Sequence, residues 1–193
     1  VTKAASPASE VEPGGTFTFT VRVSNPSAVD PITITSLTDD VYGNIATRAG
    51  SSCGALIGVT LAPGATSAPC SFTGPFAGKA GASQTDTVTV GGVDSHGFTA
   101  TAMAHATVTL TPVGPQIAVT KVASPLSEVA PGGSFKFTVQ VSNPSTVTPV
   151  TITALTDDIY GNLVTRTGST CGALIGVTLA PGATSAPCSF TGS

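Results

Sequence analysis

Four cysteines are the residues in this sequence best suited to covalent chemistry. Cys53 and Cys70 are separated by the same number of residues as Cys171 and Cys188. A zinc site would need further Cys or His ligands near each pair, and no CxxC redox motif occurs. We predict a disulfide within each pair, with buried free thiols as the alternative. Closing a loop of this length contributes about 3 kcal/mol in the chain-entropy account.

A pair of adjacent aspartates occurs twice, each time before a hydrophobic residue and Tyr-Gly-Asn. The oxygen-bearing residues are Asp39, Asp40 and Asn44, and then Asp157, Asp158 and Asn162. Carboxylates, amide oxygens and loop carbonyls suit Ca²⁺, which takes six to eight oxygen ligands. The spacing matches no EF-hand loop, so a turn capped by Asp, with Gly-Asn supplying positive φ, is the preferred interpretation. We therefore predict no cofactor, with Ca²⁺ at these residues as the alternative.

Two lysines, Lys3 and Lys121, occupy equivalent places near the start of each half of the sequence. A lysine in a first strand could form an intramolecular isopeptide bond with Asn or Asp. No Glu is clearly placed to assist that reaction, and each half already has a predicted disulfide. The sequence therefore does not favour an isopeptide bond.

No arrangement of residues indicates an enzyme. His96 and His105 stand without a neighbouring nucleophile or carboxylate motif, and surface or core-edge positions are expected for them. The sequence contains no GxSxG, HExxH, P-loop or GxGxxG motif. We predict that the protein has no catalytic residues.

These residues recur because most of the sequence is a tandem repeat of about 118 residues. Residues 1–75 match residues 119–193 without insertion or deletion, and residues 53–74 return unchanged as 171–192. Positions 16, 18 and 22 differ between the copies, whereas the apolar positions between them do not: these are Phe17, Phe19, Val21 and Val23. Because side chains alternate across a strand, the constant positions are predicted to face a core and the variable ones solvent.

The strands that must position these residues are predicted at 1–4, 16–24, 32–37, 56–61, 68–73, 85–91 and 98–110. Gly- and Pro-rich turns separate them, and no segment has the spacing of an amphipathic helix. About seven short strands with regular turns are typical of an immunoglobulin-like β-sandwich. The fold class is therefore all-β, with tandem immunoglobulin-like sandwiches.

Three segments follow from the repeat: a first repeat at 1–113, a short Pro/Gly linker at 114–118, and a second repeat at 119–193. The second repeat lacks a counterpart to residues 76–113, which read as its last strands. Either the sequence is an excerpt of a longer array, which we prefer, or a neighbouring molecule supplies those strands.

Composition excludes several classes of partner. Charged residues make up 9% of the chain and the net charge is −3, with no basic patch for nucleic acid. No apolar run reaches the roughly 18 residues that a membrane span needs. Disulfides indicate an oxidising compartment, so we expect a secreted or cell-surface location.

The order of motifs resembles a known family. Val-Thr-Lys-x-Ala-Ser-Pro begins the chain, Pro-Gly-Gly-x-Phe-x-Phe-Thr-Val-x-Val-Ser-Asn follows, and then Leu-Thr-Asp-Asp-Val-Tyr-Gly-Asn. This order is similar to the DUF11, or conserved repeat, domains of bacterial and archaeal surface proteins. The resemblance implies immunoglobulin-like sandwiches in large, secreted, repetitive proteins without enzyme activity. One departure is the turn at Asp94, where the family often carries several acidic residues.

The expected function is structural. We predict a repeat of an extracellular filament, stalk or fibre, with repeats stacked end to end and identical copies as partners. The alternative is an adhesin or carbohydrate-binding surface module, for which exposed aromatic residues would be needed. Tyr42 and Tyr160 are the only tyrosines, so the sequence itself gives no support for a glycan ligand.

Overall fold

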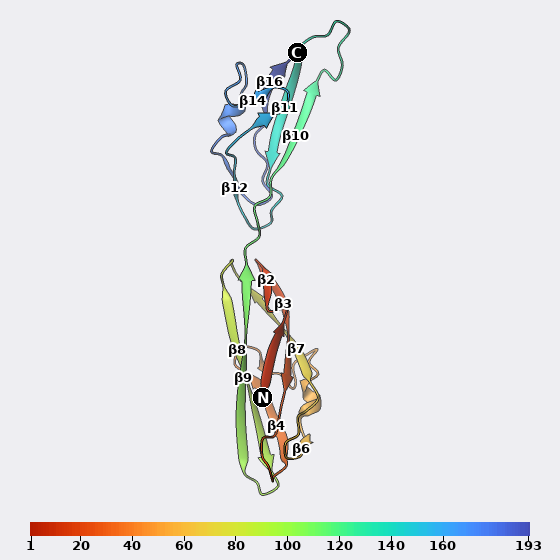
Figure 1. Ribbon diagram of the computed structural model, residues 1–193, viewed down its shortest axis with the longest axis vertical. Coiled ribbons are helices and arrows are strands. Elements are labelled where there is room, and N and C mark those ends of the chain that lie inside the picture. The colour runs from red at the N-terminus through yellow and green to blue at the C-terminus, as the bar shows by residue number, and fades with distance from the viewer. The chain divides into compact units, whose positions relative to one another are not determined.

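The computed structural model describes residues 1–193, which form two compact units, Val1–Pro112 (unit 1) and Val113–Ser193 (unit 2). The division falls beside the predicted linker (Figure 1). Both units are built almost entirely from β-strands. No helix is long and apolar enough to cross a membrane.

Unit 1 contains two sheets. Its elements are β1 (Thr2–Ser6), β2 (Ser9–Val11), β3 (Gly14–Arg22), β4 (Ile32–Asp39), β5 (Gly43–Asn44), the 3₁₀ helix η1 (Cys53–Leu56), β6 (Thr60–Leu61), β7 (Cys70–Ala77), β8 (Ser83–Asp94) and β9 (Thr99–Thr111). One sheet has the order β1-β3-β7. The other has the order β2-β9-β8-β4-β5, with β6 also paired to β4. All pairs are antiparallel except β2 with β9.

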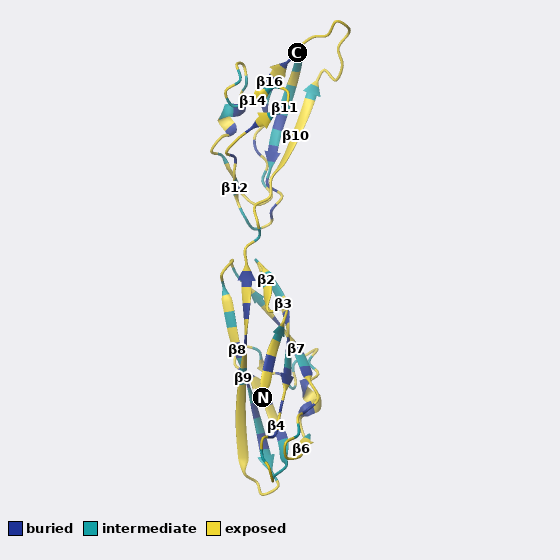
Figure 2. Ribbon diagram, viewed as in Figure 1, coloured by how far each residue is buried: buried dark blue, intermediate teal, exposed yellow.

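The core of unit 1 lies between these sheets, which makes the unit a β-sandwich. Phe17, Phe19, Val21 and Val23 are all buried, as their alternation predicted. They pack with residues of the opposite sheet, including Val88 and Val90 of β8 and Val108 of β9. Figure 2 shows β9 buried toward its C-terminal end and exposed over its first half.

The structure corrects the predicted strands in two places. Residues 56–61 were expected to form one strand, but η1 ends at Leu56 and only Thr60–Leu61 pairs with β4. β2 and β5 were not predicted, because each is too short to show an alternating pattern and depends on a partner elsewhere in the fold. The strands predicted at 85–91 and 98–110 are present as the antiparallel pair β8 and β9, of which β8 is longer than predicted.

Unit 2 has shorter strands. They are β10 (Ala118–Ser124), β11 (Phe135–Ser142), β12 (Val150–Thr151), β13 (Thr156–Asp157), β14 (Gly161–Asn162), β15 (Thr178–Leu179) and β16 (Cys188–Gly192), with the 3₁₀ helix η2 (Cys171–Leu174). β10, β11 and β16 form a sheet in the order β10-β11-β16, which matches β1-β3-β7. β12 pairs with β15, and β13 pairs with β14.

Pairing explains why a single strand of unit 1 becomes two in unit 2. β4 is paired along most of its length with β8. Its counterpart in unit 2 has no such neighbour, so only the ends that pair with β15 and β14 remain strands. For the same reason Phe135 and Phe137 are only partly buried, whereas their counterparts Phe17 and Phe19 are completely buried.

Candidate functional site

Each unit contains the predicted disulfide. Cys53 in η1 is bonded to Cys70 at the start of β7, and Cys171 in η2 is bonded to Cys188 at the start of β16. The Cα atoms are 4.8 Å apart in both. No cysteine is free. The disulfide therefore fastens the long connection between β5 and β6, or its counterpart, to the edge of the first sheet.

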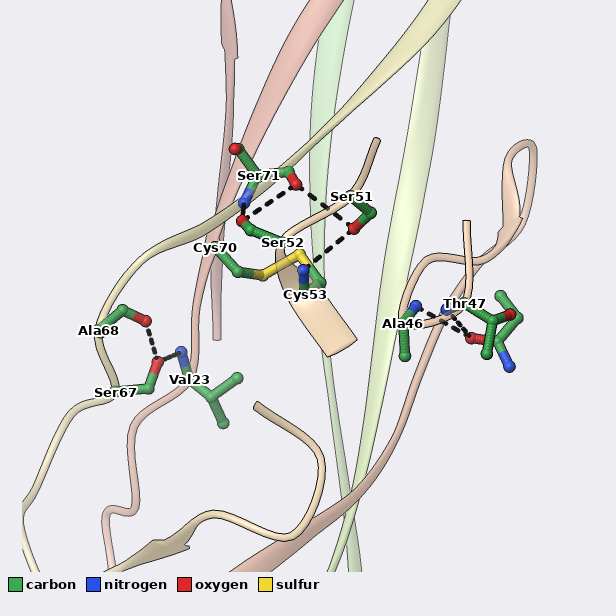
Figure 3. Close-up of a disulfide and its surroundings, with 11 residues drawn as sticks. Val23, Ala46, Thr47, Ser51, Ser52, Cys53, Ser67, Ala68, Cys70 and Ser71 are labelled. Atoms are coloured by element: carbon green, nitrogen blue, oxygen red, sulfur yellow. Dashed lines mark hydrogen bonds between the residues drawn. A yellow bond between two sulfur atoms is a disulfide. The ribbon is translucent and has the colours of Figure 1, made fainter. Parts of the chain in front are cut away.

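Serine side chains support the disulfide of unit 1 (Figure 3). The backbone N–H of Cys53 donates to Ser51 Oγ at 3.1 Å, and that of Ser71 donates to Ser52 Oγ at 2.8 Å. The Ser52 N–H in turn donates to the Ser71 carbonyl at 2.9 Å. These bonds hold η1 beside β7 independently of the sulfur atoms.

The predicted oxygen cluster of unit 1 is occupied with hydrogen bonds to the protein itself. Asp39 Oδ1 accepts the N–H groups of Val41 and Tyr42 at 3.0 and 2.9 Å. Asp40 Oδ1 accepts the N–H of Thr87 at 2.7 Å, which ties the turn to β8. Asn44 Oδ1 accepts the N–H of Ala46 at 3.0 Å.

The corresponding turn of unit 2 has the same organisation. Asp157 Oδ1 accepts the N–H groups of Ile159 and Tyr160, both at 3.1 Å. Asn162 Oδ1 accepts the N–H of Val164 at 2.9 Å, and Asp158 is exposed. Gly43 and Gly161 have φ of 74° and 70°, as a turn with positive φ requires. No group of three or more His, Cys, Asp or Glu side chains in residues 1–193 is arranged to hold a metal ion.

A cluster that the sequence did not reveal lies inside unit 1. The side chains of Lys3 in β1, Asp39 at the end of β4 and Asp86 in β8 have no exposed surface, and we call them the buried triad. Lys3 Nζ lies 2.6 Å from Asp39 Oδ2 and also contacts Asp86 Oδ2. The other oxygen of Asp86, Oδ1, has no hydrogen-bond partner.

Aromatic rings enclose the buried triad. Lys3 Nζ lies 4.7 Å from the centre of the Phe19 ring and 5.4 Å from that of Phe72. Burial raises the pKa of the Asp86 carboxyl above its ordinary value, because desolvation outweighs the opposing hydrogen bond and charge of Lys3. The negative charges of Asp39 and Asp40 raise this pKa further. The protonated form of Asp86 is favoured as a result.

One sequence feature could have indicated Asp86. Residues 86, 88 and 90 share a face of the strand predicted at 85–91, and Val88 and Val90 are core residues. A carboxylate on that face needs a buried cation, because an unpaired buried charge is strongly disfavoured. Nothing local indicates that Lys3, 83 positions earlier in the chain, is that cation.

The lysine of unit 2 has a different environment. Lys121 Nζ contacts Asp157 Oδ2 and lies 4.5 Å from the centre of the Phe137 ring, but its side chain is 34% exposed. The contact lowers the pKa of Asp157, chiefly through the hydrogen bond from Lys121, with smaller contributions from the Tyr160 and Ile159 N–H groups. The residues described include no second carboxylate in contact with Lys121.

Both tyrosines belong to the packing of their units. Tyr42 contacts the rings of Phe19 and Phe72, and its hydroxyl accepts a hydrogen bond from Gln84 Nε2 at 2.6 Å. Burial raises the pKa of the Tyr42 hydroxyl, and the hydrogen bond from Gln84 opposes this rise. A Cβ at Gly74 would lie 2.3 Å from the Tyr42 ring, so glycine is required where the ring crosses β7.

The histidines lie where they were expected, at the surface. His105 is exposed on β9. His96 is exposed in the turn between β8 and β9, with Nδ1 3.9 Å from Asp94 Oδ2 and 4.0 Å from Asp30 Oδ1. Asp94 Oδ1 also accepts the N–H of His96 at 2.8 Å, so this acidic residue shapes the turn.

Comparison with known proteins adds no identification. No protein-family model matches the chain, and no curated protein is similar to it in sequence.

Proposed function

We propose that the chain is a segment of an extracellular structural protein, in which immunoglobulin-like repeats stack end to end as a filament, stalk or fibre. The proposal also takes up the resemblance to DUF11-type surface repeats. It assigns the protein no enzymatic activity and takes copies of the same repeat as its principal partners.

The observation that carries this proposal is the recurrence of whole sets of contacts. Asn25 and Asn143 are both buried and bind equivalent backbone carbonyls, those of Leu61 and Leu179. Arg48 donates to the Thr73 carbonyl at 2.9 Å, and its counterpart Arg166 donates to the Thr191 carbonyl at 3.1 Å. Units that share these internal contacts can present matching surface patches, and matching patches can repeat one contact along an array.

The disulfides support an extracellular location. Stable disulfides form in oxidising compartments and are rare in the cytosol. Each repeat also closes its own disulfide, so the covalent framework of one unit does not depend on another. This independence suits a protein built from many copies of one unit.

The alternative, an adhesin or carbohydrate-binding module, has one observation in its favour. The two tyrosines are packed in their units, but Phe98 is 73% exposed beside the turn between β8 and β9 and could contact a sugar ring. A glycan array comparing the natural chain with Phe98→Ala tests this alternative. Equal, background-level signals from both proteins would exclude it.

Immunogold labelling of native cells tests the structural proposal. Antibodies raised against unit 1 are expected to decorate extended surface structures at regular intervals. Antibodies raised against unit 2 should label the same structures, because the two units share most of their sequence. Labelling confined to the cell interior, or to dispersed particles, would overturn the proposal.

A further inference from the structure

The buried triad spans the two sheets of unit 1. Lys3 belongs to the sheet β1-β3-β7, whereas Asp39 and Asp86 belong to the opposite sheet. The disulfide joins β7 to η1, in the connection between β5 and β6, and makes no direct bond between strands of the two sheets. A covalent bond from Lys3 to either aspartate would be a direct link between strands of the two sheets.

The triad is poorly explained as an ordinary ion pair. With all three groups ionised, one cation would face two carboxylates in a site lined by Phe19 and Phe72, leaving an excess negative charge. Buried ions normally have all their hydrogen-bonding capacity satisfied, because desolvation is costly. Asp39 meets this condition through two backbone N–H groups and Lys3, but Asp86 Oδ1 has no partner.

We propose that Lys3 and Asp86 are joined by an intramolecular isopeptide bond, and that Asp39 is the catalytic carboxylate that transfers protons during its formation. The Lys3 nitrogen already contacts the Asp86 carboxyl group, and Asp39 Oδ2 lies 2.6 Å from the same nitrogen. The three groups required for the reaction are therefore held together before it begins, which removes most of its entropic cost.

The reaction is a condensation that needs no external reagent. Asp39 takes one proton from the Lys3 ammonium, and the neutral amine attacks Cγ of the protonated Asp86 carboxyl. A bond forms between Nζ and Cγ, and one Cγ–O bond breaks. The departing oxygen leaves as water with its own proton and one from Nζ, while Asp39 retains the proton it accepted. One water is released for each amide formed, and no electrons are transferred.

The surroundings favour each step. Desolvation raises the pKa of Asp86, so this carboxyl is the one that can present the protonated, electrophilic form. The Phe19 and Phe72 rings beside Nζ exclude water from the site, which prevents competing hydrolysis. The product is an uncharged amide beside a protonated Asp39, so the reaction removes every charge from the triad.

Unit 2 provides an internal control. Lys121 has the same relation to Asp157 and to Phe137 that Lys3 has to Asp39 and Phe19. Asp86 lies in residues 76–113, which have no counterpart among residues 119–193. Within residues 1–193 Lys121 contacts a proton acceptor and no acyl partner, so a polypeptide of these residues should keep Lys121 as a free amine.

Mass spectrometry of the intact, reduced 193-residue chain tests the proposal. The expected mass is lower than the sequence mass by one water molecule. Proteolysis should yield one branched peptide that joins the segments containing Lys3 and Asp86. An amine-reactive label applied to the unfolded, reduced chain should modify Lys121 and leave Lys3 unmodified. A mass equal to the sequence mass, or full labelling of Lys3, would overturn the proposal.

Two substitutions separate the roles of the carboxylates. Asp86→Ala should restore the full sequence mass and make Lys3 reactive to the label. Asp39→Asn should leave most chains without the bond although Asp86 is present, because the amide cannot accept the proton. Asp158→Asn, at an exposed position of unit 2, is the matched control and should keep the loss of one water.

The branched peptide also guards against a false positive. Cyclisation of an aspartate to a succinimide lowers the mass equally but joins no two peptides. Loss of water without a branched Lys3–Asp86 peptide would therefore contradict the proposed bond. Complete bond formation in Asp39→Asn would contradict the catalytic role proposed for Asp39. Since the decisive measurement is made on the natural sequence, poor folding of a variant does not affect it.

Discussion

Lys3 and Lys121 show how the same residue acquires two different environments in one chain. Both contact the first aspartate of the Asp-Asp turn and lie over an aromatic ring. Only the Lys3 side chain is completely buried, and only Lys3 also contacts a carboxylate of a further strand, Asp86 of β8. At the scale of the residue, the environment depends on which strands cover the site.

The aromatic residues in contact with these lysines, Phe19 and Phe137, should contribute differently to stability, with the larger contribution in unit 1. Phe19→Ala removes a fully buried ring and is expected to lower the free energy of unfolding of unit 1 by about 3–5 kcal/mol. Phe137→Ala should cost unit 2 less, because Phe137 is only partly buried. Amide hydrogen exchange, followed separately in peptides of each unit, measures both effects. Equal losses of protection would contradict this account.

The turn of unit 2 should make its stability dependent on pH. The pKa of Asp157 lies below its ordinary value of 3.8, so its contribution is complete above that pH. As the pH falls through the lower, folded-state pKa, the carboxylate is protonated and the contribution is lost. Asp157→Asn should flatten the stability of unit 2 between about pH 2 and 5, whereas Asp158→Asn should not. Urea unfolding at each pH tests this, and identical curves for both variants would refute it.

At the scale of the element, each unit depends on connections that are fastened by side chains. The segment after β3 is held by Asn25, whose side-chain amide donates to the carbonyls of Asp30 and Leu61. The connection between β5 and β6 is held to β7 by the disulfide and by Ser51 and Ser52. These contacts, rather than strand pairing alone, fix the long loops against the sandwich.

Removing the amide of Asn25 should therefore be costly. Asn25→Ala leaves buried carbonyls without donors and is expected to lower the free energy of unfolding of unit 1 by about 2–4 kcal/mol. Ser24→Ala, at the exposed neighbouring position, should change it by less than about 0.5 kcal/mol. Urea unfolding monitored by hydrogen exchange distinguishes them. Similar losses for the two variants would show that the amide is not important.

The disulfides should stabilise each unit separately. Replacing Cys171 and Cys188 together by alanine should lower the free energy of unfolding of unit 2 by about 3 kcal/mol. Unit 1 should keep its full protection, because its own disulfide, Cys53–Cys70, is intact. Hydrogen exchange of both units in the double variant checks this. Loss of protection in both would show that the units do not fold independently.

The elements that the sequence predicted are those with local signals. The alternation at 17–23 predicted the buried face of β3, and the equal spacing of the cysteine pairs predicted both disulfides. β2 could not be predicted, because the short segment Ser9–Val11 is a strand only through its pairing with β9, where Ser9 lies opposite Thr109. The buried triad is also non-local: its members come from three strands, and their meeting depends on how the two sheets pack.

At the scale of the whole molecule, each of the two units has its own hydrophobic cluster and its own disulfide. Units of this kind contribute stability mainly through their own folding and through contacts with neighbours. A bond between Lys3 and Asp86 would add a covalent link across the sandwich of unit 1. Such a link would suit a protein that carries mechanical load, because it would keep β1 attached to β8 when the chain is pulled.

The measurement that tests the central claim most directly is cryo-electron microscopy of native cell-surface material containing this chain. The account predicts extended assemblies in which successive densities match the unit 1 fold, each with a density bridge at the Cys53–Cys70 position. Dispersed globular particles, or assemblies whose repeating density does not fit this sandwich, would contradict it.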